Sequence, residues 1–167
     1  RVRIDYLYLC AALSPFDAYL ILLGLETLSE RVAKQVSNAE KLIRYLESKK
    51  DYVLWVKHPY AQNSPYRELA KKYLPKGAGS VFTFGFNGTP KQYAKFLNSV
   101  KLFSYHANIG DARSIIINSP TTTHAELTPE QRKQADLAPE TIRISAGLED
   151  DGDLIADLEQ AFEKAYQ

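Results

Sequence analysis

Two short segments of the chain place large apolar residues at every second position. Phe82, Phe84 and Phe86 form the first series, and Ile142 and Ile144 form the second. Successive side chains of a β-strand point to opposite faces of a sheet, so this period predicts two half-buried strands. Each strand would have one apolar face, which must be covered by another layer of secondary structure.

Helix-start signals recur between the predicted strands. Ser14-Pro15, Thr89-Pro90 and Thr128-Pro129 each place a capping residue before a proline at the first helical position. In the second and third, Gln92 and Gln131 complete the form of a capping box. Helices are therefore expected to begin at these three points.

The remaining segments complete an alternating pattern of helices and strands. Short strands are expected at 53–56, 102–105 and 114–118, and further helices begin at Ser64-Pro65 and at Asp150-Asp151. The first helix continues into residue 46, with a bend near Gly24 or Ser29. Four apolar helix faces are expected to point inward, formed by Val32, Val36, Ala39, Ile43 and Leu46; by Tyr66, Leu69, Ala70 and Tyr73; by Tyr93, Phe96, Leu97 and Val100; and by Leu154, Ile155, Leu158, Ala161, Phe162 and Ala165. This pattern predicts a two-layer α/β domain.

Composition excludes several classes of protein. The net charge of +1 gives no basic footprint for nucleic acid or an anionic membrane, and no apolar run is long enough to span a bilayer. A single cysteine, Cys10, favours a soluble protein of a reducing compartment. His58, His106 and His124 are too scattered for a zinc site. The chain has no methionine and begins with a charged, helical pattern at residues 1–5, without a cleavable signal. We therefore expect that either its start was processed or it is a piece of a longer protein.

Arg143 is the first candidate binding residue. It alternates with Ile142 and Ile144, so its side chain should leave the strand on the face away from them. A guanidinium held on a rigid strand suits bidentate capture of a carboxylate or phosphate. The alternative is an ordinary salt bridge within the chain.

Several motifs together resemble a known family. The segments 108–114 (NIGDARS), 119–124 (SPTTTH) and 143–150 (RISAGLED) look like the carboxy-terminal part of the Cys/Met-metabolism pyridoxal-phosphate (PLP) enzymes. Upstream, the segments 14–20, 24–28 and 69–77 also match, in the same order and spacing. The resemblance thus covers nearly all of the chain.

The resemblance implies a fold and a domain organisation. It implies the C-terminal domain of a fold-type I PLP-dependent transferase, with a small mixed sheet and helices on one side. Residues 1–167 would form this domain, and residues 1–50 would contain the long helices that link it to a cofactor-binding domain. That PLP-binding domain, with its Schiff-base lysine, would lie upstream of this chain.

The resemblance also implies roles for three residues. Arg143 would bind the α-carboxylate of an amino-acid substrate. Thr123 would help to orient that carboxylate, and Asn108 would contact it from a position where many relatives have serine. No catalytic, cofactor-binding or metal-binding residue is expected in this chain itself.

Asn108, Arg113 and Ser114 together resemble most the O-acetylhomoserine sulfhydrylase branch of the family. This branch would make homocysteine and acetate from O-acetyl-L-homoserine and sulfide, in a cytoplasmic homotetramer, and this chain alone would be inactive. A cystathionine γ-synthase or methionine γ-lyase type of member is an alternative within the family. A free-standing amino-acid-binding domain is an alternative of another class.

Overall fold

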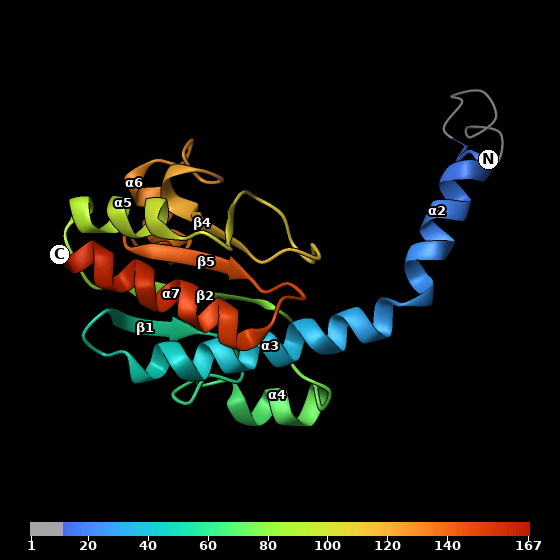
Figure 1. Ribbon diagram of the computed structural model, residues 1–167, viewed down its shortest axis with the longest axis horizontal. Coiled ribbons are helices and arrows are strands. Elements are labelled where there is room, and N and C mark those ends of the chain that lie inside the picture. Colours follow the sequence, from blue (N-terminus) through green and yellow to red (C-terminus); the bar gives the residue numbers. More distant parts are fainter. Residues whose placement is uncertain (1–11) are drawn as a thin grey trace. The chain divides into compact units, whose positions relative to one another are not determined.

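A computed structural model describes residues 12–167 (Figure 1). Cys10 and the helical pattern expected at residues 1–5 lie outside the described residues. The chain divides into two compact units, Arg1–Arg31 and Val32–Gln167.

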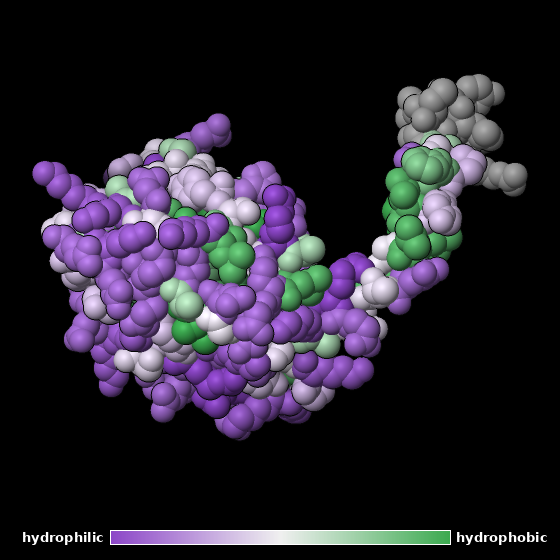
Figure 2. Space-filling view, in the orientation of Figure 1, coloured by the Kyte–Doolittle hydropathy of each residue, from purple (hydrophilic) through white to green (hydrophobic). Residues whose placement is uncertain are grey.

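The described part of the first unit contains the helix α2, Pro15–Glu26, and the start of α3, Leu28–Ser48. The Ser14 hydroxyl caps α2 by accepting from the Asp17 N–H at 3.1 Å, as predicted. The chain leaves helical geometry at Thr27, which lies between the two positions where a bend was expected. No residue of α2 is buried, although the helix is predominantly apolar, and Figure 2 shows apolar side chains along its visible face.

The second unit is organised around a five-stranded sheet. Its strands are β1 (Val53–Lys57), β2 (Val81–Phe86), β3 (Ser104–Tyr105), β4 (Ile115–Asn118) and β5 (Thr141–Ser145). They lie in the order β1-β2-β5-β4-β3. Only the β3–β4 pair is parallel, so the sheet is mixed. β5 is the central strand and is paired on both edges.

Helices cover the apolar face of this sheet. Phe84 and Ile144 are fully buried there together with residues of α3, α5 (Pro90–Ser99) and α7 (Asp151–Tyr166). The ring of Phe96 on α5 stacks on Phe162 of α7 with centroids 4.5 Å apart, and it meets Phe84 edge-on at 6.3 Å. Figure 1 shows α5 and α7 side by side against the sheet. The predicted two-layer α/β class with a small mixed sheet is confirmed.

Four of the five predicted helix starts have the expected cap. The start predicted at Ser64-Pro65 is wrong, because the helix there begins only at Arg67 and no side chain caps it. Thr89 caps α5, and Thr128 caps α6 (Pro129–Gln134), each in a complete capping box with the glutamine three residues later. The Asp150 carboxylate caps α7 and accepts from the Gly152 N–H at 2.8 Å. Local capping chemistry was therefore sufficient to place these starts.

One predicted helix face is wrong. The helix α4 spans Arg67–Tyr73, but Tyr66, Leu69 and Tyr73 are 54% to 66% exposed, and only Ala70 of the predicted face is buried. An amphipathic pattern shows that one face is apolar, but the rest of the fold decides what covers it. Val32 is likewise 43% exposed, because the buried face of α3 begins only at Gln35.

Two strand boundaries also differ from the prediction. The segment expected at 102–105 pairs only over Ser104–Tyr105, and the segment expected at 114–118 begins at Ile115. Within residues 12–167, no helix combines the length and the apolar character needed to cross a membrane.

Candidate functional site

Arg143 lies at the centre of the sheet. It pairs in register with Thr83 of β2 on one side and with Ile117 of β4 on the other. Its side chain is half-buried, whereas the flanking Ile142 and Ile144 are fully buried on the opposite, helix-covered face. The strand therefore holds the base of this side chain rigidly, as its alternation with the isoleucines predicted.

The guanidinium of Arg143 has no acidic partner in the part of the chain that the structure describes. No described carboxylate lies within 4.0 Å of it, and no hydrogen bond from its side chain is formed there. Burial lowers the pKa of Arg143 from its ordinary value, because desolvation disfavours the charged form. Within residues 12–167 the structure thus argues against an ordinary salt bridge and leaves a cation available to an external anion.

The loop that contains Asn108 reaches the same face of β5. The Gly110 N–H donates to the Ser145 hydroxyl at 3.3 Å, and Ser145 shares a strand face with Arg143 because the two are separated by one residue. Gly110 has a φ of +73°, which glycine adopts without strain. The turn chemistry of the loop therefore brings it against the arginine strand.

Asn108 itself is held by its own loop. Its side-chain N–H donates to the Asp111 carboxylate at 3.1 Å, and its side-chain oxygen accepts from the Ile109 N–H at 2.9 Å. The Arg113 N–H donates to Asp111 at 3.0 Å, and together with the Asn108 bond it lowers the pKa of that carboxyl. The side chains of Asp111 and Arg113 also pair, at 3.6 Å.

A network of polar contacts joins this loop to the segment that follows β5. Glu149 accepts from both the N–H and the hydroxyl of Ser114, each at 2.8 Å. The Gly147 N–H donates to the Ser114 hydroxyl at 2.8 Å. A Cβ at Gly147 would lie 2.4 Å from the carbonyl carbon of Arg113, so only glycine allows the two backbones to approach this closely. The segments 108–114 and 143–150 therefore pack together as one unit.

The helix α3 anchors the same unit from the other side. Gln35 donates to the Asp111 carbonyl at 2.8 Å, and Asn38 donates to the carbonyls of Gly147 and Glu149 at 3.0 and 2.8 Å. Both side chains are buried. Gln35 and Asn38 were not among the predicted site residues, although two amides beside the apolar face of a helix were a visible signal.

Thr123 is in a different position. It follows the short 3₁₀ helix η1, Ser119–Thr121, which packs against β5. Its side chain is exposed, and its hydroxyl oxygen lies 2.9 Å from the His124 Nδ1 atom. The structure brings the loops of Asn108 and Thr123 to the central strand, but no hydrogen bond joins Thr123 to Arg143 or to Asn108.

This arrangement is suited to binding a small carboxylate. It combines a desolvated guanidinium on a rigid strand with two loops that carry hydroxyl, amide and backbone N–H groups. The described residues contain no group of three or more histidine, cysteine or acidic side chains placed to hold a metal ion.

Comparison with known proteins places this arrangement in a family. Residues 5–163 match the family described as Cys/Met metabolism PLP-dependent enzyme. The homocysteine synthase of Schizosaccharomyces pombe is 44% identical over 152 residues, which cover 91% of this chain and 35% of that protein.

Solved structures share the fold at similar coverage. A Campylobacter jejuni protein assigned to O-acetylhomoserine (thiol)-lyase, which carries a pyridoxyl-lysine monophosphate, superposes with a TM-score of 0.86 at 37% identity, over 96% of this chain and 39% of that one. Cystathionine gamma-lyase from yeast superposes with a TM-score of 0.88 at 30% identity, over 96% and 41%.

The chain spans between 35% and 41% of the length of these three relatives. The family match, in contrast, extends over almost the whole of this chain. The motifs that form the packed unit around β5 are those on which the resemblance depended. On this evidence the chain belongs to the Cys/Met metabolism PLP-dependent enzymes.

Proposed function

We propose that this chain is the C-terminal domain of a PLP-dependent O-acetylhomoserine sulfhydrylase, and that its part in the reaction is to bind the α-carboxylate of the substrate. The observation that carries the proposal is the half-buried Arg143 guanidinium, which has no carboxylate partner among the described residues. In a family that acts on amino acids, the external anion that fits this cation is an α-carboxylate.

Residues 1–50 would contain the helices that link this domain to the cofactor-binding domain. The helix α2 supports this assignment, because it has no buried residue and exposes apolar side chains such as Phe16, Leu22 and Leu25. A helix that is apolar on all sides is normally buried. The relatives are more than twice as long as this chain, so a further domain of the intact protein would cover α2.

Asn108 and Thr123 would complete the carboxylate site. The amide of Asn108 is already bonded within its loop, so we assign it to shaping the loop that contacts the carboxylate. The exposed Thr123 hydroxyl would orient the substrate from the opposite loop. Holding one end of the substrate in this way fixes the position of its reacting carbons.

The residues of this chain do not by themselves fit the cofactor. No described lysine hydrogen-bonds to β5 or to the loop 108–113, whose polar contacts come from Gln35, Ser145, Leu148 and the loop itself. PLP supplies an electron sink for proton removal next to the substrate amine. We assign its binding to the domain upstream.

The first test is the mass of the native polypeptide. An antibody against this domain, used on extract of the source cells, should detect a species more than twice the size of the 167-residue chain. A species of about this size would leave no place for the cofactor-binding domain and would favour a free-standing amino-acid-binding domain.

The second test is the activity of the intact enzyme. Given O-acetyl-L-homoserine and sulfide, it should release homocysteine and acetate, whereas the 167-residue chain alone should not. A preference for cysteine over sulfide would identify a cystathionine γ-synthase, and release of a keto acid and ammonia would identify a γ-lyase. We further expect the intact enzyme to be a cytoplasmic homotetramer, which size-exclusion chromatography with light scattering and cell fractionation would check.

Arg143→Gln in the intact enzyme should lower kcat/KM for O-acetylhomoserine by about 100-fold, through loss of charge-assisted hydrogen bonds of about 1.5–3 kcal/mol each. Arg143→Lys should give an intermediate loss, because lysine retains the charge but not the planar fork. Lys95→Gln is the matched control, since it removes an exposed cation from α5 on the opposite side of the sheet. Unchanged kinetics of Arg143→Gln would contradict the proposal.

A further inference from the structure

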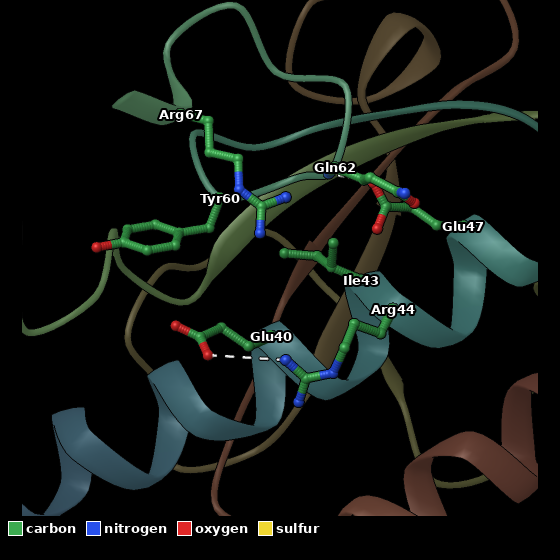
Figure 3. A pocket seen from close by; sticks show the side chains of 7 residues that line it. All are labelled: Glu40, Ile43, Arg44, Glu47, Tyr60, Gln62 and Arg67. Carbon is green, nitrogen blue, oxygen red and sulfur yellow. Dashed lines mark hydrogen bonds and ion pairs between the residues drawn. The ribbon is translucent and has the colours of Figure 1, made fainter. Parts of the chain in front are cut away.

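A polar cavity lies away from the arginine strand. It has a volume of about 410 Å³ and is formed between α3 and the loop 58–67 that follows β1 (Figure 3). Side chains from these two segments point into it from opposite sides. None of them belongs to the site around Arg143.

Two arginines from separate segments converge on this cavity. Arg67, at the first turn of α4, points from the loop side toward α3, and Arg44 approaches from α3 (Figure 3). Arg44 has only a long contact with Glu40, at 3.9 Å. Arg67 is half-buried and has no ion pair or side-chain hydrogen bond within residues 12–167. Together they place two positive charges on the wall of the cavity.

Two carboxylates line the same cavity. Glu47 accepts from the Gln62 N–H through one oxygen at 2.6 Å, which fixes the side chain and leaves its second oxygen without a hydrogen bond among the described residues. Glu40 lies about two helical turns earlier on the same face of α3 (Figure 3). With Arg44 and Arg67, the formal charge of the lining is zero. A simple anion would therefore be attracted by two groups and repelled by two others.

Uncharged residues complete the lining of the cavity. The ring of Tyr60 lines the cavity. Its hydroxyl donates to the Leu74 carbonyl at 2.8 Å, and Leu74 is not part of the lining. The buried Ile43 forms the floor on the side of α3. The cavity thus combines positive groups, negative groups and an apolar wall within the volume of one small molecule.

We propose that this cavity binds a free α-amino acid as a zwitterion, at a site separate from the proposed substrate site on β5. The ligand carboxylate lies between Arg44 and Arg67, its ammonium group meets Glu40 or the free oxygen of Glu47, and its side chain lies along Tyr60. The alternating charges of the lining select a molecule that carries both charges.

The test uses L-norleucine, an amino acid with an uncharged straight side chain, and the 167-residue chain labelled with ¹⁵N. Amide NMR shifts should saturate on titration, with the largest change at Gln62, whose N–H is bonded to Glu47. N-acetyl-L-norleucine lacks the ammonium group and L-norleucinamide lacks the carboxylate, so both should bind about tenfold more weakly or worse. Equal binding of either analogue would overturn the zwitterion assignment.

Two variants locate the binding. Arg67→Gln should weaken the L-norleucine binding that the Gln62 amide reports about tenfold, with Arg67→Lys partly restoring it, whereas Lys95→Gln should leave it unchanged. The amide spectra of the free variants establish that each is folded. Absence of saturable binding to the unaltered chain, or loss of binding in Arg143→Gln but not in Arg67→Gln, would overturn the proposal. Neither result would affect the proposed role of Arg143 in catalysis, which the kinetics of the intact enzyme test separately.

Discussion

The two faces of β5 differ in how completely their side chains find packing or hydrogen-bond partners within the domain. On one face, Ile142 and Ile144 are fully buried against helices and aromatic rings. On the other face, Arg143 has no acidic partner, and the buried Thr141 hydroxyl has no hydrogen-bond partner among the described residues. A single strand thus contributes stability through one face and leaves the Arg143 guanidinium available for binding on the other.

The difference shows how a small domain can combine a rigid site with a stable core. Close packing on the isoleucine face fixes the strand, so the base of the Arg143 side chain is held in place without bonds of its own within the domain. Natural proteins commonly leave such unsatisfied groups at functional sites, where they reduce stability. The following predictions test this separation of roles.

The largest expected effect on folding is on the apolar face. Ile144→Ala should lower the free energy of unfolding by about 2–5 kcal/mol, because it leaves a cavity in place of a fully buried side chain. Urea denaturation followed by circular dichroism measures the change. A loss below about 1 kcal/mol would show that this face is less tightly packed than the structure indicates.

The second prediction concerns the end of the polar face. Gly147→Ala should lower the free energy of unfolding by about 1–3 kcal/mol, because the added Cβ would lie 2.4 Å from backbone atoms of Arg113 and Ser114. Gly24→Ala is the matched control, since a Cβ there meets nothing within 4 Å. Urea denaturation compares the two variants, and a Gly147→Ala protein as stable as the control would show that the two motifs are not closely packed.

The third prediction is that Arg143 contributes little to folding. Arg143→Met should leave the free energy of unfolding within about 0.5 kcal/mol of its starting value or raise it, because it removes a partly desolvated charge that lacks a described partner. Thermal and urea unfolding of the 167-residue chain would measure this. A loss of more than about 2 kcal/mol would mean that Arg143 is structural, and the contrast between the two faces would fail.

The smallest effect is expected in the loop beside Arg143. The Arg113 N–H and then the Asn108 amide hold the pKa of Asp111 below its ordinary value of 3.8. A carboxyl whose pKa is lowered on folding stabilises the folded state above that ordinary value, and the contribution is lost as the pH falls through the folded pKa.

A carboxyl NMR titration should therefore find the pKa of Asp111 below 3.8, and Asn108→Ala should raise it only in part, because the backbone bond remains. Asn108→Ser would provide a hydroxyl donor, so it should restore part of the lowering of the Asp111 pKa. A pKa of Asp111 that does not respond to Asn108→Ala would separate Asn108 from the loop network.

Most of the helices and strands, and the family, could be predicted from the sequence. Alternation of Phe82 to Phe86 and of Ile142 with Ile144 depends only on the strand geometry of neighbouring residues, and the caps at Thr89 and Thr128 depend on contacts three residues apart. Both kinds of signal are local, so they could be found without the fold. The face of β5 from which Arg143 projects followed from the same local rule.

Only the tertiary structure decided which residues complete the site and which surfaces stay exposed. That Arg143 lacks a described acidic partner, and that Asn38 anchors residues 147 and 149 from more than a hundred positions away, depends on long-range packing. The same is true of the outward face of α4, where Tyr66 and Tyr73 remain exposed. A hydrophobic pattern gives the period of an element, but the contacts that satisfy its side chains come from segments that are distant in the sequence and adjacent only in the folded chain.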